Sequence, residues 1–289
     1  MRDVQLPDGT TMPVLGLGTW RMGEASARRE AEVANLRSAI ELGYRLIDTA
    51  EMYGEGGAET VVGRALAEAF QAGEVAREDM FVVSKVYPHN ASRRGTVSAC
   101  DRSRRRLGLD CIDLYLLHWR GEHPLAETVE AMESLVAAGK VRAWGVSNLD
   151  LADMQELQAL TAPSPAVHGQ CAVNQVYYSL TERGPEFSLL PWMRERSMPL
   201  MAYSPIDQGS LAADDTLAEI GRSRGLTAAQ VALAWVIGQP GVVAIPKASS
   251  VAHLKENLAA EQVALSEHEL RLIDSRFPAP KKKTRLSMI

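Results

Sequence analysis

The sequence predicts an α/β protein, a (β/α)8 TIM barrel, and three observations lead to this prediction. Eight short apolar runs alternate with amphipathic helical stretches, which is the pattern of βαβ units around a parallel sheet. Eight such units in about 275 residues suit a closed barrel. A doubly wound sheet usually carries G-x-G-x-x-G after its first strand, and residues 16–21 (GLGTWR) lack the third glycine. Because no linker-like stretch or close repeat interrupts the chain, one domain over residues 1–289 is expected.

The expected elements follow in order along the chain. Residues 4–6 and 11–13 predict a hairpin with its turn at Asp8-Gly9. Barrel strands are predicted at residues 14–18, 46–48, 81–85, 111–118, 141–146, 172–177, 200–203 and 242–245. Helices are predicted at residues 27–42, 58–71, 92–107, 125–138, 151–160, 186–197, 216–239, 251–260 and 267–276, and Gly43 suits the end of the first of them.

Composition and charge exclude several classes of protein. The 289 residues include 31 basic and 36 acidic side chains, and the net charge of −5 argues against a nucleic-acid-binding protein. No apolar run approaches the roughly 18 residues that cross a bilayer, and the first residues lack the apolar core of a signal peptide. Three cysteines without a CxxC pair argue against a disulfide framework. We therefore expect a cytoplasmic protein that binds neither nucleic acid nor membrane, and we expect a monomer.

Polar residues interrupt the apolar runs at one end of seven predicted strands. These residues are Asp48, Lys85, His118, Ser147-Asn148, Gln175, Tyr203-Ser204 and Lys247. In an α/β barrel the chemistry lies at the carboxyl ends of the strands. One polar residue there often belongs to a structural ion pair, but seven at the same end are hard to ascribe to packing. The pattern predicts a functional site above the barrel.

Four side chains suit acid catalysis of carbonyl reduction. Tyr53 lies five residues after Asp48, and a tyrosine with its ordinary pKa near 10 is a poor acid at pH 7. The Lys85 ammonium is expected to lower that pKa, Asp48 to keep Lys85 charged and in place, and His118 to donate a hydrogen bond to a carbonyl oxygen. Such an acid matches the negative oxygen that develops when hydride adds to a carbonyl. No metal is expected, because no H-E-x-x-H motif occurs and the six histidines do not cluster.

The run GYRLIDTA at residues 43–50, followed by Tyr53-Gly54, resembles the signature of the aldo-keto reductases. Further motifs resemble that family in its own order along nearly the whole chain: GLGTW at 16–20, SK at 84–85, DLYLLHW at 113–119, GVSN at 145–148, NQV at 174–176, AYSP at 202–205, and IPK at 245–247 with EN at 256–257. The resemblance implies a barrel whose base is capped by an N-terminal β-hairpin. It also implies an NADPH-dependent enzyme that reduces aldehydes or ketones to alcohols, with Tyr53 as general acid and Asp48, Lys85 and His118 completing a catalytic tetrad.

The same resemblance implies a cofactor site at the carboxyl ends of the strands. Ser147, Asn148 and Gln175 match the residues that hold the nicotinamide carboxamide, and Tyr203 matches the ring that stacks on the nicotinamide. The other implied cofactor contacts are Thr19, Trp20 and Asp48, the pyrophosphate region Ser204 with the loop Pro205, Ile206, Asp207, Gln208 and Gly209, the 2′-phosphate contacts Lys247 and Ser249, and the adenine contacts Glu256 and Asn257. His253 lies where many family members carry an arginine, so the prediction includes NADH as a second cofactor.

Candidate walls of the substrate pocket lie just past the predicted strand ends, at Trp20, Met22, Tyr87 and Trp119. Three aromatic rings favour a mostly apolar pocket for a small-molecule carbonyl substrate. Two other functions stay open. One is a nicotinamide-cofactor-binding regulatory or redox-sensing subunit without significant turnover, and the other is a barrel isomerase or aldolase that uses Lys85 to form a Schiff base.

Overall fold

The structure is a computed structural model that describes residues 2–161 and 170–289. Its main sheet has eight parallel strands, hydrogen-bonded in chain order: β3 (Leu17–Gly18), β4 (Leu46–Asp48), β5 (Phe81–Val86), β6 (Ile112–Leu117), β7 (Val141–Ser147), β8 (Asn174–Tyr177), β9 (Leu200–Tyr203) and β10 (Val242–Ala244). Leu15 forms a parallel bridge with Ala244, and the Gly16 N–H donates to the Ala244 carbonyl at 2.9 Å. The segment before β3 thus closes the sheet into the predicted barrel.

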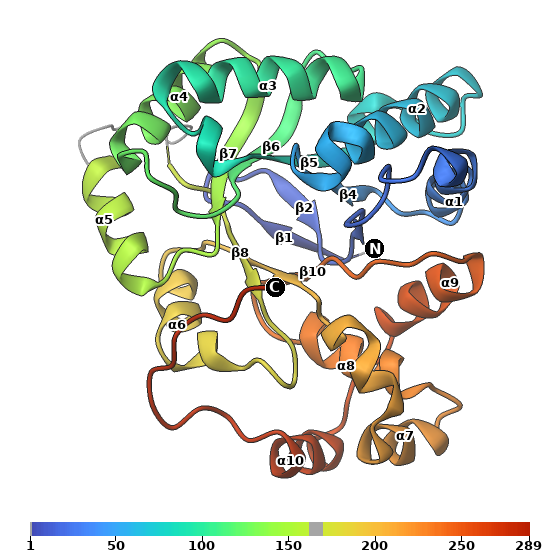
Figure 1. The fold of residues 1–289 in the computed structure, drawn as a ribbon. Coiled ribbons are helices and arrows are strands. Elements are labelled where there is room, and N and C mark those ends of the chain that lie inside the picture. Colours follow the sequence, from blue (N-terminus) through green and yellow to red (C-terminus); the bar gives the residue numbers. More distant parts are fainter. Residues whose placement is uncertain (1, 162–169) are drawn as a thin grey trace.

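Helices surround the barrel on its outer face (Figure 1). They are α1 (Arg29–Glu41), α2 (Gly57–Gln71), α3 (Arg93–Leu107), α4 (Leu125–Ala137), α5 (Leu151–Thr161), α6 (Leu189–Arg194), α7 (Asp215–Arg222), α8 (Ala228–Ile237), α9 (Val251–Ala260) and α10 (Glu267–Arg276). Within the described residues, no helix is long and apolar enough to cross a membrane.

The predicted hairpin is present and plugs one end of the barrel. Strands β1 (Asp3–Gln5) and β2 (Thr11–Pro13) pair antiparallel, and Gly9 takes the left-handed φ of 86° that the tight turn requires. Leu6 and Met12 belong to the same apolar cluster as Leu46 and Phe81, which begin β4 and β5. The hairpin therefore closes the end of the barrel where its strands begin, and the opposite end stays available for a site.

Side chains alternate along each strand and form two apolar layers. The barrel interior is filled by a cluster that includes Leu46, Phe81, Val83, Leu114, Leu116, Met201, Val243 and Ile245. The residues between them in sequence, such as Ile47, Val82 and Tyr115, belong to the larger cluster that packs the barrel against the helices. Successive side chains of a strand point to opposite faces. A residue two positions after an interior side chain therefore also points into the barrel.

Two predicted helices are wrong in extent. Residues 216–239 form two helices, α7 and α8, because Gly225 takes a left-handed φ of 66° and Thr227 caps a new helix by accepting the Gln230 N–H at 3.2 Å. Residues 186–197 form only the short α6, preceded by the 3-10 helix η6 (Gly184–Phe187). Residues 222–225 carry no apolar side chain and residues 227–230 (TAAQ) have the pattern of a capping box, so the sequence held a signal for the first break that the predicted long helix passed over.

Candidate active site

The polar residues at the strand ends continue the inward-facing rows of the barrel. In each row the apolar residues of the interior cluster are followed, at a spacing of two, by a polar one: Leu46 by Asp48, Val83 by Lys85, Leu116 by His118, Val173 by Gln175, Met201 by Tyr203 and Ile245 by Lys247. A period of two places both members on the same face of a strand. The barrel therefore brings these predicted residues to one end, opposite the hairpin.

Lys85 lies at the centre of this end and is completely buried. Its ammonium nitrogen donates to Asp48 Oδ2 at 2.7 Å, to the Thr49 carbonyl at 2.8 Å and to the Tyr53 hydroxyl at 3.5 Å. An ammonium has three donors and no acceptor, so these three contacts use its full hydrogen-bonding capacity. Because Tyr53 accepts from Lys85, its own hydroxyl proton is free to be donated elsewhere.

Tyr53 is held over the barrel by a glycine-rich turn. It begins the 3-10 helix η2 (Tyr53–Gly56), in which Gly54 and Gly56 have left-handed φ values of 58° and 86°. This turn packs against the loop after β3, where a Cβ on Gly23 would come within 2.1 Å of the Gly57 carbonyl carbon. Only glycine permits that approach, which fixes η2 against the loop and places the Tyr53 hydroxyl within reach of Lys85.

His118 lies next to the ring of Tyr53 and completes the predicted tetrad. The two rings meet edge to face with centroids 5.6 Å apart, and His118 is 8% exposed. Within the described residues, His118 Nδ1 has no hydrogen-bond partner. Burial, together with the Lys85 ammonium, holds the pKa of His118 well below its usual value, so the ring is neutral at pH 7. A neutral imidazole retains one donor and one acceptor nitrogen.

The predicted direction of the Tyr53 pKa shift is wrong. Burial, the Asp48 carboxylate and Tyr203 together raise the pKa of Tyr53 well above its usual value, whereas the sequence predicted that Lys85 would lower it. The nearby ammonium is itself compensated by Asp48, and burial lowers the pKa of Lys85. Tyr53 therefore keeps its proton throughout the neutral range, as an acid must before it reacts.

A network of amides and rings joins β7, β8 and β9 beside this group. Gln175 Nε2 donates to Asp48 Oδ1 at 2.8 Å, and the Tyr203 hydroxyl donates to Asn148 Oδ1 at 2.9 Å. Ser147 donates through its hydroxyl to the Gln175 carbonyl at 2.8 Å. Asn148 takes a left-handed φ of 59°, a conformation that asparagine tolerates better than most residues, and this turns its amide toward Tyr203. The structure brings all five of these predicted residues together.

The remaining predicted cofactor residues lie around the same end. Thr19 follows β3, is buried, and donates from both its N–H and its hydroxyl to the Asp48 carbonyl at 3.0 and 2.9 Å. Ser204, Pro205, Ile206 and Gly209 lie in the loop that follows β9 and in the 3-10 helix η7 (Asp207–Ala213). Lys247, Ser249 and His253 are exposed, the first two before α9 and His253 in its first turn, and Glu256 and the buried Asn257 lie further along α9.

Three of the four predicted pocket residues lie at or near the surface, and the fourth does not. Tyr87 and Trp119 meet edge to face with centroids 5.4 Å apart, and Trp119 in turn lies 4.9 Å from the ring of His118. Trp20 is partly exposed, with the Arg21 guanidinium 4.5 Å from its ring centroid. Met22, in contrast, is 2% exposed and packs in the cluster between barrel and helices, because the loop after β3 turns inward to meet η2. Met22 is therefore not a pocket wall.

Two buried glutamates that support the site were missed. Glu51 accepts from the Tyr87 N–H at 3.2 Å, from Asn90 Nδ2 at 3.1 Å and from Arg102 at 2.5 Å, so it fixes the loop that carries Tyr87. Glu59 is completely buried and accepts from Ser84, next to Lys85, at 2.5 Å and from Arg106 Nε at 2.6 Å. A sequence signal existed for Glu59, because it shares the apolar face of α2 with Val62 and Leu66 at helical spacing.

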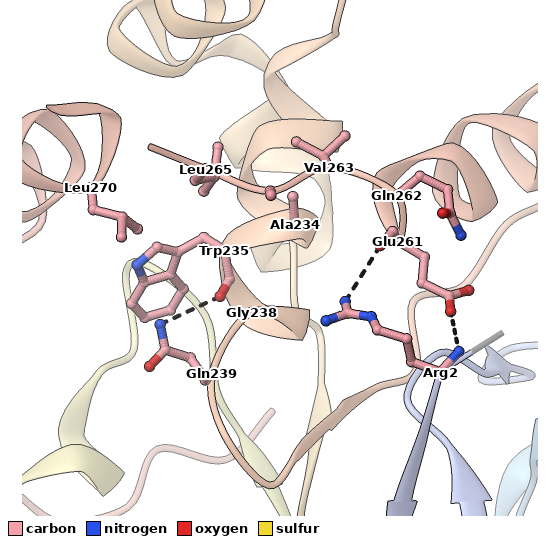
Figure 2. A pocket seen from close by; sticks show the side chains of 11 residues that line it. Arg2, Ala234, Trp235, Gly238, Gln239, Glu261, Gln262, Val263, Leu265 and Leu270 are labelled. Atoms are coloured by element: carbon pink, nitrogen blue, oxygen red, sulfur yellow. Dashed lines mark hydrogen bonds between the residues drawn. The ribbon is translucent and has the colours of Figure 1, made fainter. Parts of the chain in front are cut away.

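A pocket of about 460 Å³ lies away from these residues. Figure 2 shows it between Trp235, Leu265 and Leu270, with Arg2 hydrogen-bonded to Glu261 at one side. Arg2 precedes the hairpin and Gln239 precedes β10, so the pocket lies toward the hairpin end of the barrel. None of the predicted site residues lines it.

The site combines a protonated tyrosine, a buried ion pair and a neutral imidazole at the carboxyl ends of the barrel strands, and these groups suit the reduction of a carbonyl. The sequence profile of the Aldo/keto reductase family matches residues 14–276, and the chain belongs to this family. Its members reduce carbonyl groups, and this chain is an enzyme of that class.

Comparisons with individual proteins agree with this assignment. The chain is 50% identical to methylglyoxal reductase YeaE of Escherichia coli strain K12, over 99% of this chain and 98% of the relative. It is 34% identical to a glyoxal reductase of Bacillus subtilis, over 94% and 91% of the two chains. A crystal structure of an aldo-keto reductase from Klebsiella pneumoniae in complex with NADPH is similar at a TM-score of 0.90, with 47% identity over 100% of this chain and 99% of that chain.

Proposed function

We propose that this enzyme reduces small aldehydes with NADPH and that Tyr53 is the general acid. The observation that carries the proposal is the contact of the Lys85 ammonium with both Asp48 and the Tyr53 hydroxyl in a buried site. The similar enzymes named as methylglyoxal and glyoxal reductases point to short 2-oxoaldehydes as the substrate class. The aromatic rings of Tyr87 and Trp119 lie beside His118, where the substrate carbonyl is expected, and offer it an apolar surface.

The donor set at the strand ends fits a nicotinamide cofactor. Ser147, Asn148 and Gln175 offer the donors and acceptors that a carboxamide needs, and Tyr203 offers a ring for stacking. The exposed Lys247 and the amino-terminal turn of α9 offer positive charge for a phosphate. When bound, the reduced nicotinamide would supply the hydride. The NADPH complex of a 47% identical structure supports the same cofactor here.

Each residue of the tetrad has a separate task in this proposal. Tyr53 donates its proton to the carbonyl oxygen as negative charge develops there. Lys85 stabilises the phenolate that remains, and Asp48 keeps Lys85 charged and in position. His118 donates from its neutral ring to the carbonyl oxygen and orients it. The Schiff-base alternative is disfavoured, because the Lys85 nitrogen donates to Asp48, to the Thr49 carbonyl and to Tyr53, and all three of its donors are engaged.

The direct test is consumption of NADPH with a panel of carbonyl compounds. We expect turnover with methylglyoxal and glyoxal, and lower kcat/KM with bulky ketones. Tight binding of NADPH with no turnover on any carbonyl would instead support the regulatory or redox-sensing alternative. Turnover of a carbonyl substrate that requires no nicotinamide at all would favour the isomerase or aldolase alternative.

Lys247→Ala should weaken NADPH binding far more than NADH binding. Lys247 is exposed beside α9, where the 2′-phosphate is expected, and only NADPH carries that group. Loss of one charge-assisted contact costs about 1.5–3 kcal/mol, which is roughly 10- to 150-fold in Kd. Quenching of protein fluorescence gives both dissociation constants. An equal loss for the two cofactors would remove Lys247 from the 2′-phosphate site.

His253→Arg should strengthen NADPH binding at pH 8 and leave NADH binding nearly unchanged. The His253 N–H donates to the Ser250 hydroxyl at 3.2 Å, so the residue lies in the first turn of α9, close in sequence to Lys247 and Ser249. An arginine is always charged and can bind a phosphate through two parallel donors, which the imidazole of a histidine cannot do. We expect a gain of about tenfold in NADPH affinity. Lys255→Arg, a change on the same helix that preserves charge, is the control and should have no effect.

A further inference from the structure

Tyr177 ends β8 beside the cofactor residues but has no role in the family resemblance or in the tetrad. It is 7% exposed, and its ring is stacked on Tyr203 with centroids 5.6 Å apart and an interplanar angle of 21°. The two residues are register partners on neighbouring strands, so the barrel itself sets this stacking. Tyr177 thus supports the ring that the proposed function places against the nicotinamide.

The hydroxyl of Tyr177 makes a second connection, to the loop after β9. It donates to Asp207 Oδ1, and Asp207 Oδ2 accepts from the Ser210 hydroxyl. Although burial opposes it, hydrogen bonds from Ser210, Tyr177 and Thr181 hold the pKa of Asp207 below its usual value, so the acceptor is a carboxylate. Tyr177 therefore binds the loop through a charge-assisted hydrogen bond, the stronger kind.

The loop needs such an anchor because its backbone is strained. Ser204, Asp207 and Gln208 have left-handed φ values of 48°, 50° and 51°, a region that costs energy for residues other than glycine. Within the loop the Asp207 N–H donates to the Ser204 carbonyl at 2.9 Å. A strained backbone persists only when contacts with the surrounding structure hold it in place. The hydrogen bond from Tyr177 to the Asp207 side chain is such a contact, and it joins the loop to the barrel.

We propose that Tyr177 and Asp207 form a latch that holds the loop of residues 204–210 against the barrel and thereby retains the bound nicotinamide cofactor. The inference rests on the proposed function, which places the pyrophosphate beside this loop and the nicotinamide on Tyr203. Tyr177 is a positioning residue: it acts on the cofactor through Tyr203 and Asp207. Because the pyrophosphate is common to both cofactors, the latch acts equally on NADPH and NADH.

The neighbouring tyrosine provides a matched control. Tyr178 is completely buried and faces the opposite side of the strand, where its hydroxyl donates to Glu186 at 2.8 Å and its ring lies 5.6 Å from that of Trp235. Tyr178→Phe therefore removes a buried hydroxyl from the residue that follows β8, also bonded to a carboxylate, and leaves the backbone hydrogen bond of Tyr178 to the Tyr203 carbonyl in place. Any effect that Tyr177→Phe shares with Tyr178→Phe is a general effect on packing.

The experiment measures cofactor dissociation by stopped-flow fluorescence in the parent, Tyr177→Phe, Asp207→Ala, the double variant and Tyr178→Phe. We expect each latch variant to release NADPH and NADH about tenfold faster than the parent, the size expected for one hydrogen bond to a charged group. The double variant should be no faster than the faster single variant, because both substitutions break the same contact. Tyr178→Phe should release both cofactors at the parent rate.

The latch would be overturned if Tyr177→Phe released the cofactors at the parent rate. It would also be overturned if the increase in release rate of the double variant equalled the product of the increases in the two single variants. A larger effect on NADPH than on NADH would also overturn it, because the loop would then act on the 2′-phosphate. Failure of the parent to bind either nicotinamide cofactor is a different result, which refutes the proposed function itself. Tyr177→Phe keeps the ring that stacks on Tyr203, so its Tm in thermal unfolding should be about the same as that of Tyr178→Phe.

Discussion

Tyr53→Phe should lower kcat for aldehyde reduction by roughly 10²–10⁴-fold, the usual contribution of a general acid. The substitution deletes one hydroxyl, which Lys85 contacts at 3.5 Å, and keeps the ring that meets His118 edge to face. Cofactor affinity should stay within about threefold of the parent, because none of the residues expected to hold the carboxamide changes. Single-turnover kinetics with NADPH and methylglyoxal isolate the chemical step from product release.

Tyr115→Phe is the matched control for this experiment. Tyr115 is completely buried in β6, but its side chain belongs to the cluster between barrel and helices, and burial raises the pKa of its hydroxyl as it does that of Tyr53. Both variants lose a tyrosine hydroxyl, Tyr115 from a completely buried ring and Tyr53 from a partly exposed one, and only Tyr53 lies next to Lys85. Tyr115→Phe should keep nearly full turnover. Near-normal single-turnover rates in Tyr53→Phe would show that another group donates the proton.

The same directions of pKa shift predict a flat pH profile for the reduction. The pKa of Tyr53 is raised, so the phenol stays protonated at pH 9, and that of His118 is lowered, so the imidazole stays neutral at pH 6. Neither group changes its charge between those values. The single-turnover rate should therefore vary by less than about threefold from pH 6 to 9, and a steep alkaline loss would indicate a tyrosine that ionises early.

The sequence predicted the fold and the position of the site because both depend on short-range patterns. Strand side chains alternate with a period of two, so the polar residue that follows each apolar row must face the barrel interior, as Asp48, Lys85 and His118 do. The hairpin also follows from a short-range pattern, because Asp-Gly between two short strands is a strong signal for a tight turn. The break at Gly225 had a local signal as well, a polar run that ends in glycine followed by the capping pattern of residues 227–230, which the predicted helix over residues 216–239 passed over.

What the sequence could not predict depends on distances between elements. The sign of the Tyr53 pKa shift follows from a balance between burial, Asp48 and Lys85, and only the packed structure decides that balance. Glu51 links the end of β4 to the loop after β5, and Tyr177 links β8 to a loop after β9. No spacing along the chain indicates such partners.

The second large effect is expected from the buried ion pair. Lys85→Met leaves the Asp48 carboxylate, 2% exposed, with Gln175 Nε2 as its remaining side-chain donor at 2.8 Å. A buried charge that loses its partner costs about 3–5 kcal/mol in the free energy of unfolding. Thermal unfolding should therefore show a clear drop in Tm relative to the parent, and turnover should fall as far as in Tyr53→Phe, because Tyr53 loses the ammonium that stabilises its phenolate.

The double variant Asp48→Asn/Lys85→Met distinguishes a structural role of this pair from a catalytic one. Replacing both partners of a buried ion pair by neutral groups of similar size is often neutral for stability, so the double variant should recover most of the Tm lost in Lys85→Met. It still has no ammonium beside Tyr53, so its single-turnover rate should stay as low as that of Lys85→Met. Recovery of turnover together with Tm would mean that the pair serves only to hold β4 and β5 together, and it would refute the catalytic role of Lys85. A Tm that stays low in the double variant would show that the lost lysine packing, and not the uncompensated Asp48 charge, destabilises the single variant.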